Sequence, residues 1–117
     1  SSDAGGVPPT AAVLMDIDGM ERSGAGFGVG PVDAIFNVIN DMLGREPELE
    51  QNAINAITSG TDALGEVTVR LGEGNFKAVG RGAHPDILVA SARAYVNALN
   101  NLAKKEKEGE RLHCQHG

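Results

Sequence analysis

Gly26-Phe27-Gly28-Val29-Gly30-Pro31-Val32-Asp33 returns later in the chain as Gly80-Arg81-Gly82-Ala83-His84-Pro85-Asp86. The two glycine pairs and the proline recur at a constant offset of 54 residues. Alternating apolar residues precede each copy: Val13, Met15 and Ile17 before the first, and Val67, Val69 and Leu71 before the second. A repeat of this kind predicts one structural unit used twice, here two strands, a glycine corner and a helix.

The first copy has clear boundaries. We expect a strand at 11–17, a two-residue turn at Asp18-Gly19, and a second strand that ends near Gly26. Pro31 opens a helix, where a missing N–H costs nothing, and Gly44 ends it. The spacing predicts one apolar stripe on this helix, formed by Ile35, Phe36, Ile39, Met42 and Leu43.

The second copy follows a segment at 47–59 that fits a short helix or a strand, with the flanking proline and glycine favouring a strand. We expect strands at 66–71 and 76–80, joined by a turn at 72–75. Pro85-Asp86 begins the last helix, whose predicted stripe is Leu88, Ala92, Tyr95, Leu99 and Leu102. The fold class is therefore α+β, an internally duplicated two-layer sandwich with about six strands and two main helices.

Size and composition narrow the function. A chain of 117 residues with 41% hydrophobic and 3% aromatic residues supports one domain with an aliphatic core. A net charge of −6 argues against nucleic-acid binding, and the chain lacks an apolar run that could span a membrane. The single Cys114 fits a reducing cytoplasm. We expect a linker at 1–8, a folded domain at 9–103 and a charged, disordered tail at 104–117.

The glycine corners have two interpretations. Glycine permits positive φ and close packing of a helix on a strand, whereas a helix N-terminus attracts a carboxylate or phosphate. The spacing matches neither a dinucleotide motif nor a P-loop, so a small carboxylate is the better candidate. Nearby acids, Asp33, Asp62 and Asp86, suit helix or turn capping, or alternatively pairing with a ligand ammonium.

Catalytic residues are not evident in this sequence. His84 stands alone between a strand and a helix, which favours a capping role over acid–base chemistry. His113-Cys114-Gln115-His116 contains three possible metal ligands, but their spacing matches no standard zinc pattern. We therefore expect no catalytic residues, no metal and no cofactor in this chain.

Three ordered motifs closely resemble the C-terminal regulatory domain of 2-isopropylmalate synthases and related citramalate synthases. The matching stretches are Gly28 to Ala34, Thr61 to Val67, and Gly80 to Tyr95 followed by Asn97-Ala98-Leu99-Asn100. The resemblance implies a domain that dimerises, binds the end-product amino acid near the subunit interface and mediates feedback inhibition. It also implies an upstream catalytic barrel that uses a divalent metal and acetyl-CoA, and that lies outside this sequence.

The resemblance also assigns effector-binding residues position by position. They are Gly28, Val29, Gly30, Val32 and Asp33 at the first corner, Leu49, Asn52 and Ala56 on the middle segment, Asp62 and Ala63, and Pro85, Asp86 and Ile87 at the second corner. The stretch from Asp86 to Tyr95 is more similar to isopropylmalate synthases, so leucine is the expected effector. Isoleucine sensing in a citramalate synthase and a purely structural dimerisation module are the alternatives.

Overall fold

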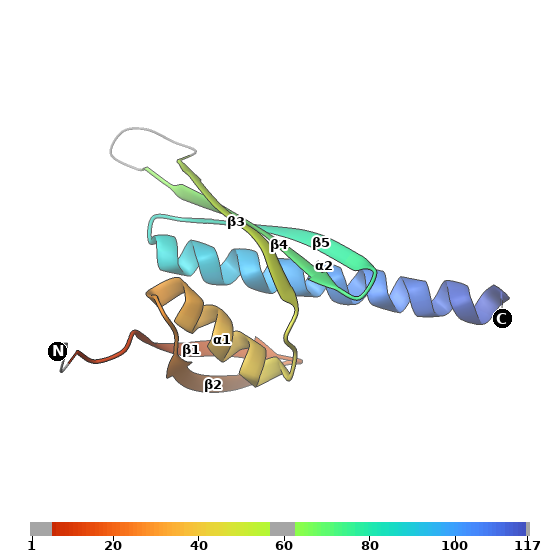
Figure 1. Ribbon diagram of the computed structural model, residues 1–117, viewed down its shortest axis with the longest axis horizontal. Coiled ribbons are helices and arrows are strands. Elements are labelled where there is room, and N and C mark those ends of the chain that lie inside the picture. Colours follow the sequence, from red (N-terminus) through yellow and green to blue (C-terminus); the bar gives the residue numbers. More distant parts are fainter. Residues whose placement is uncertain (1–5, 57–62, 117) are drawn as a thin grey trace. The chain divides into compact units, whose positions relative to one another are not determined.

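The computed structural model describes residues 6–56 and 63–116, and the side chains of these residues as far as Leu112. Within these described residues, five strands and two helices follow one another in the order β1-β2-α1-β3-β4-β5-α2 (Figure 1). The chain groups into two compact units, residues 1–46 and residues 47–117. The α+β class is confirmed, and the described part of the chain contains five strands, where the sequence predicts about six.

The first unit is an antiparallel hairpin covered by one helix. Strands β1 (Thr10–Ile17) and β2 (Met20–Phe27) pair along their whole length and turn at Asp18-Gly19, both with positive φ. Helix α1 (Pro31–Leu43) has proline in its first turn and ends at Gly44 in the left-handed conformation. Each of these features follows the sequence prediction.

Helix α1 packs on β2 and the residue after it through alternate glycines. A side chain added at Gly24 would meet Met42, one at Gly26 would meet Val38, and one at Gly28 would meet Ala34. Strand residues two apart thus lie under helix residues four apart, because both spacings cover similar lengths. The buried part of α1 consists of Ala34, Ile35, Phe36, Val38 and Ile39.

The second unit is a three-stranded antiparallel sheet with one helix on it. Strands β3 (Glu48–Ala56), β4 (Gly65–Glu73) and β5 (Phe76–His84) lie in that order, so the described part of the segment at 47–59 forms a strand as expected. Helix α2 (Ile87–His116) runs along β5 and β4 (Figure 1). Its core partners in the sheet are Val67, Val69, Leu71 and Ala78.

Several details of the sequence prediction for this unit were wrong. The turn is only Gly74-Asn75, and β5 continues past Gly80 to His84, so the second glycine pair lies inside a strand instead of at a corner. Of the predicted stripe on α2, Tyr95, Leu99 and Leu102 are buried, but Leu88 is 37% exposed, and the buried face also includes Ala90, Ala94 and Ala98. These alanines face Gly80 and Gly82, where any side chain would collide with the helix backbone.

Another difference concerns the C-terminal segment. The helix continues through the charged residues from Lys104 to His116, where the composition predicts disorder. Two contacts hold this extension on the β4–β5 hairpin: Lys105 Nζ donates to the carbonyl of Lys77 at 2.6 Å, and Gly109 lies against the ring of Phe76. Arg111 and Glu108 also pair along the helix.

The duplication itself stays a prediction. Each unit contains an antiparallel hairpin followed by a helix that packs on the second strand of the hairpin. The second unit has an additional strand, β3, before its hairpin.

Candidate functional site

The start of α1 lacks a side-chain cap. Gly30 is the N-cap residue, with φ −153° and ψ 172°, and no side-chain hydrogen bond closes this end within the described residues. Pro31 has no N–H, so the first backbone donors of the helix belong to Val32 and Asp33. A Cβ added at Gly30 would meet nothing within 4 Å. The space beside these donors is therefore open.

Asp33 is used inside the loop that leads into α1. Its Oδ2 accepts a hydrogen bond from the N–H of Val29 at 2.9 Å and another from Nδ2 of Asn37 at 3.3 Å. The same Asn37 amide donates to the carbonyl of Phe27 at 3.0 Å. A Cβ at Gly28 would come within 2.6 Å of Asp33 Oδ2, so glycine is required there. These hydrogen bonds to the loop and to Asn37 account for the Asp33 carboxylate, and its pairing with an ammonium stays a prediction.

The start of α2 carries its own cap. Asp86 Oδ1 accepts a hydrogen bond from the N–H of Leu88 at 2.9 Å, which makes Asp86 the N-cap residue of a helix beginning at Ile87. The expected start at Pro85 is therefore two residues early. His84 Nδ1 accepts from the N–H of Asp86 at 2.9 Å, which gives this histidine the loop role that the sequence favours.

Strand β3 brings the middle group of candidate residues onto one face. Leu49 lies opposite Leu71, Asn52 opposite Val69 and Ala56 opposite Gly65, and residues directly opposite each other share a face of the sheet. Leu71 and Val69 face α2 and are fully buried. Among the described elements α2 contacts β5 and β4 but not β3, so α2 does not cover this part of the same face. Leu49 is 45% exposed.

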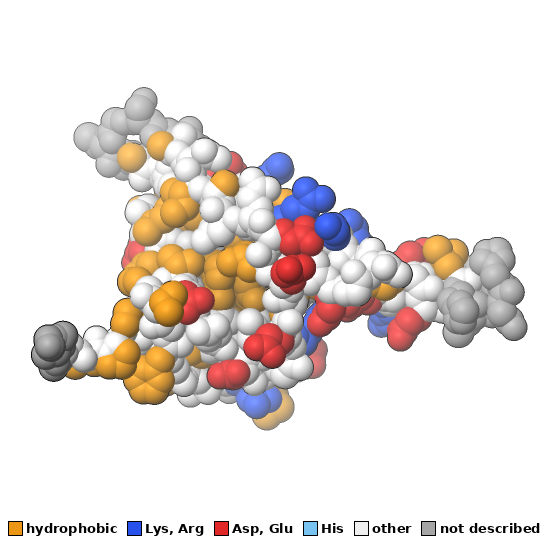
Figure 2. Space-filling model, viewed as in Figure 1, with side chains coloured by type: hydrophobic (Ala, Val, Ile, Leu, Met, Phe, Trp, Pro, Cys, Tyr) orange, Lys and Arg blue, Asp and Glu red, His pale blue; other side chains and the backbone are white. Residues whose placement is uncertain are grey.

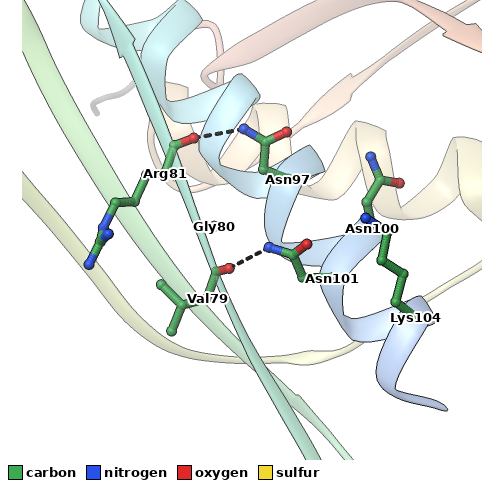
Figure 3. Close-up of a pocket in the computed structure, with 7 residues that line it drawn as sticks. All are labelled: Val79, Gly80, Arg81, Asn97, Asn100, Asn101 and Lys104. Carbon is green, nitrogen blue, oxygen red and sulfur yellow. Dashed lines mark hydrogen bonds between the residues drawn. The ribbon is translucent and has the colours of Figure 1, made fainter. Parts of the chain in front are cut away.

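Side chains of α2 that sequence reasoning missed close the outer edge of β5. Asn97 Nδ2 donates to the carbonyl of Arg81 at 2.7 Å, and Asn101 Nδ2 donates to that of Val79 at 2.8 Å (Figure 3). Arg93 and Lys105 continue this series towards Ala83 and Lys77. We call the four side chains the edge ladder. Their spacing of four residues along a helix, beside alternating strand residues, is the signal that could have revealed them.

An open hollow of about 560 Å³ lies beside the edge ladder. Its lining is polar and comprises Val79, Gly80, Arg81, Asn97, Asn100, Asn101 and Lys104 (Figure 3). Two of its three asparagines already donate to carbonyl groups at the edge of β5. Pairing of the strand edge therefore explains much of the polar lining without a ligand.

The predicted site residues thus fall into three described groups. The first is the α1 start in the first unit, and the second and third are the β3 face and the α2 start in the second unit. Ala63 is exposed, and Asp62 lies outside the described residues. The side chains of the tail residues 113–116 also lie outside the described part of the structure.

Two further searches covered the described residues only. They contain no cluster of three or more histidine, cysteine, aspartate or glutamate side chains able to hold a metal ion. Neither helix, so far as it is described, is long and apolar enough to cross a membrane.

Comparison with known proteins identifies the family. The model of the LeuA allosteric (dimerisation) domain matches residues 2–103. The 2-isopropylmalate synthase of Nitratidesulfovibrio vulgaris is 64% identical over 106 residues, which cover 91% of this chain and 21% of that protein. The 2-isopropylmalate synthases of Solidesulfovibrio magneticus and Syntrophus aciditrophicus are 53% and 45% identical, over 86% and 92% of this chain and 20% and 21% of theirs.

The chain spans about a fifth of the length of these curated relatives. The matched region includes both glycine motifs, both helix starts and β3. The extension of α2 beyond residue 103 lies outside the family model. The chain therefore belongs to the LeuA allosteric (dimerisation) domain family, as its three sequence motifs predict.

Proposed function

We propose that this chain is the leucine-sensing domain of a 2-isopropylmalate synthase and that leucine binding inhibits the parent enzyme. The family and the names of the relatives support a regulatory role in that enzyme. The single observation that carries the choice of an amino-acid effector is the open N-terminus of α1 at Gly30.

A carboxylate suits the start of α1 because backbone N–H groups and the helix dipole both favour negative charge there. The start of α2 is a poorer candidate, since Asp86 already accepts a hydrogen bond from its first turn. We therefore assign the effector carboxylate to the donors of Val32 and Asp33, with Gly30 keeping the approach clear.

The β3 face supplies a second candidate contact set, which we treat separately because it belongs to the other unit. Leu49 and Ala56 offer apolar contact, and Asn52 between them offers an amide. A branched aliphatic side chain matches such a lining better than a charged one. Binding here requires a second surface over β3, which fits the dimer expected of a dimerisation domain.

The activity of the parent protein belongs to this proposal as well. We expect the upstream catalytic part to condense acetyl-CoA with a 2-oxo acid, using a divalent metal, and this chain alone to be inactive. We also expect the chain to form a homodimer.

Calorimetry on purified chain tests the effector assignment. We expect leucine to bind more tightly than isoleucine or valine. Gly30→Ala should weaken leucine binding and Gly30→Asp should weaken it further, because an aspartate there both caps the helix and repels the carboxylate. Gly6→Asp adds the same charge at a glycine with equally open surroundings, before β1, and should leave the affinity unchanged.

Three results would redirect the proposal. Tighter binding of isoleucine would favour the citramalate-synthase alternative. A dimer that binds none of the three amino acids would favour a structural module. Unchanged leucine affinity in Gly30→Asp would place the carboxylate elsewhere.

A further inference from the structure

Strand β3 contains one extra residue relative to its partner β4. Glu48 and Leu49 lie opposite Gly72 and Leu71, but the next pair is Gln51 with Arg70, so Glu50 has no residue opposite it. A β-bulge of this kind inverts the alternation of side chains on one side of the irregularity. It is the reason why Leu49 and Asn52, three positions apart, share a face.

The side chain of Glu50 is held on the opposite face of the sheet, away from α2. Its Oε1 lies 3.4 Å from Nε of Arg70 on β4, and its Oε2 lies 3.1 Å from Nζ of Lys77 on β5. The Glu50 side chain is only 22% exposed, compared with 47% for Arg70 and 56% for Lys77. One carboxylate thus connects all three strands. Figure 2 shows acidic and basic side chains side by side over this sheet.

Gly72 makes room for this arrangement. A Cβ at position 72 would lie 2.5 Å from Glu50 Oε2 and 3.2 Å from its Cδ. Any larger residue would push the carboxylate away from its two cationic partners. We call Glu50, Arg70, Lys77 and Gly72 the bulge clamp.

Without the bulge, regular pairing would place Glu50 opposite Leu71 and turn Leu49 to the face away from α2. Leu49 would then leave the face that carries Asn52 and Ala56. Leu49 is too exposed for burial alone to fix its direction strongly. The ion pairs of Glu50 favour the bulged register, which the apolar contacts of Leu49 do not fix.

We propose that Glu50 is a positioning residue: the bulge clamp fixes the register of β3 and thereby directs Leu49 towards the effector. The role of Leu49 in binding rests on the proposed function, whereas the effect of the clamp on register does not. Exposed ion pairs are individually weak, so we expect the loss of both to reduce leucine affinity by about two- to tenfold.

Two variants break the clamp in different ways. Glu50→Gln removes the charge, and Gly72→Ala keeps the charge but displaces the carboxylate. Glu66→Gln, a charge removal on β4 outside the clamp, is the matched control. NMR of the ligand-free chain reports the register directly, through backbone NOEs that show whether residue 49 or residue 50 lies opposite Leu71.

In both clamp variants we expect NOEs from the regular register to gain intensity and leucine affinity to fall, with no change in the control. One molar NaCl should shift the register of the unsubstituted chain in the same direction, because it screens the ion pairs. It should have little effect on Glu50→Gln.

Residue 49 remaining opposite Leu71 in both clamp variants would overturn the proposal. A shifted register with unchanged leucine affinity would also overturn it, since Leu49 would then have no part in binding. If the unsubstituted chain does not bind leucine, the proposed function fails, and the NOEs of the ligand-free variants still decide whether the clamp sets the register.

Discussion

Gly80→Ala tests whether the repeated glycines serve packing. An added Cβ at position 80 would lie 2.7 Å from Cα of Ala98 and closer still to the backbone of Ala94. Ordinary van der Waals contact begins at 3.4 Å, and backbone atoms cannot turn away as the end of a side chain can. Helix α2 would have to move away from β5 as a whole.

The expected cost is about 1–3 kcal/mol of unfolding free energy, the range for overpacking a tight core. In a domain of this size that corresponds to a melting temperature lower by roughly 4–12 °C. The displacement of α2 would also lengthen the hydrogen bonds of Asn97 and Asn101 to β5, which lie on the two sides of Ala98 along the helix.

Gly26→Ala is the matched comparison from the first copy of the motif. Its nearest obstacle is a methyl group of Val38 at 3.1 Å, which can shift slightly. Reduced freedom of the unfolded chain offsets part of that strain, so stability should change by less than about 1 kcal/mol. Thermal and urea unfolding of both variants measure the two changes in stability. Equal losses for Gly26→Ala and Gly80→Ala, or none for Gly80→Ala, would refute this account of the glycines.

Two further predictions concern α2. The double variant Asn97→Ala with Asn101→Ala should lower the unfolding free energy by about 1–3 kcal/mol, because each substitution removes one hydrogen bond to β5. It should also increase self-association measured by light scattering, because the edge of β5 is then open to another chain. Asn100→Ala, a neighbour on the same helix, should change stability by less than about 0.5 kcal/mol. Asp86→Ala should cost about 0.5–2 kcal/mol as a lost N-cap, whereas Asp86→Asn keeps a good cap and should be nearly neutral in urea unfolding. If Asp86→Asn nevertheless weakens leucine binding by about 1–3 kcal/mol in calorimetry, Asp86 pairs with the effector ammonium.

Local signals predicted the first unit well. Asp18-Gly19 forms the expected turn, Pro31 and Gly44 mark the two ends of α1, and the apolar stripe of that helix is buried as expected at Ile35 and Ile39. Turn and cap preferences act over a few residues, so the sequence carries them directly.

The second unit was harder because tertiary contacts override local preference. Glycine usually weakens a strand, yet Gly80 and Gly82 lie inside β5 because α2 packs directly on them. Asparagine is a poor helix former, but Asn97 and Asn101 are stabilised by the carbonyl groups of β5. The charged segment after Lys104 is helical where composition alone favours disorder, because the hairpin of the same unit supports it.

The candidate site residues stay a prediction, and the sequence did not reveal how those on β3 are arranged. Leu49, Asn52 and Ala56 are three and four positions apart, which fits a helix face better than a strand. Only the bulge at Glu50 places all three on one face of β3. A bulge depends on the partner strand, so sequence periodicity within β3 cannot reveal it.

The two helix starts differ chemically although the sequence around them repeats. Extending the offset of 54 residues aligns Gly30 with His84 and Val32 with Asp86. In the second copy these two residues form a closed loop: His84 accepts from the N–H of Asp86, and the Asp86 carboxylate caps α2. In the first copy neither position carries a hydrogen-bonding side chain, and Asp33 turns back to Val29 instead. In α2 a carboxylate thus accepts from a backbone donor of the first turn, whereas the Asp33 carboxylate of α1 accepts from the preceding loop and leaves the first donors of its helix without a side-chain cap. This difference leads us to assign the effector carboxylate to α1, and it makes Gly30→Asp, which would give α1 the kind of cap that α2 already has, the most direct test of that assignment.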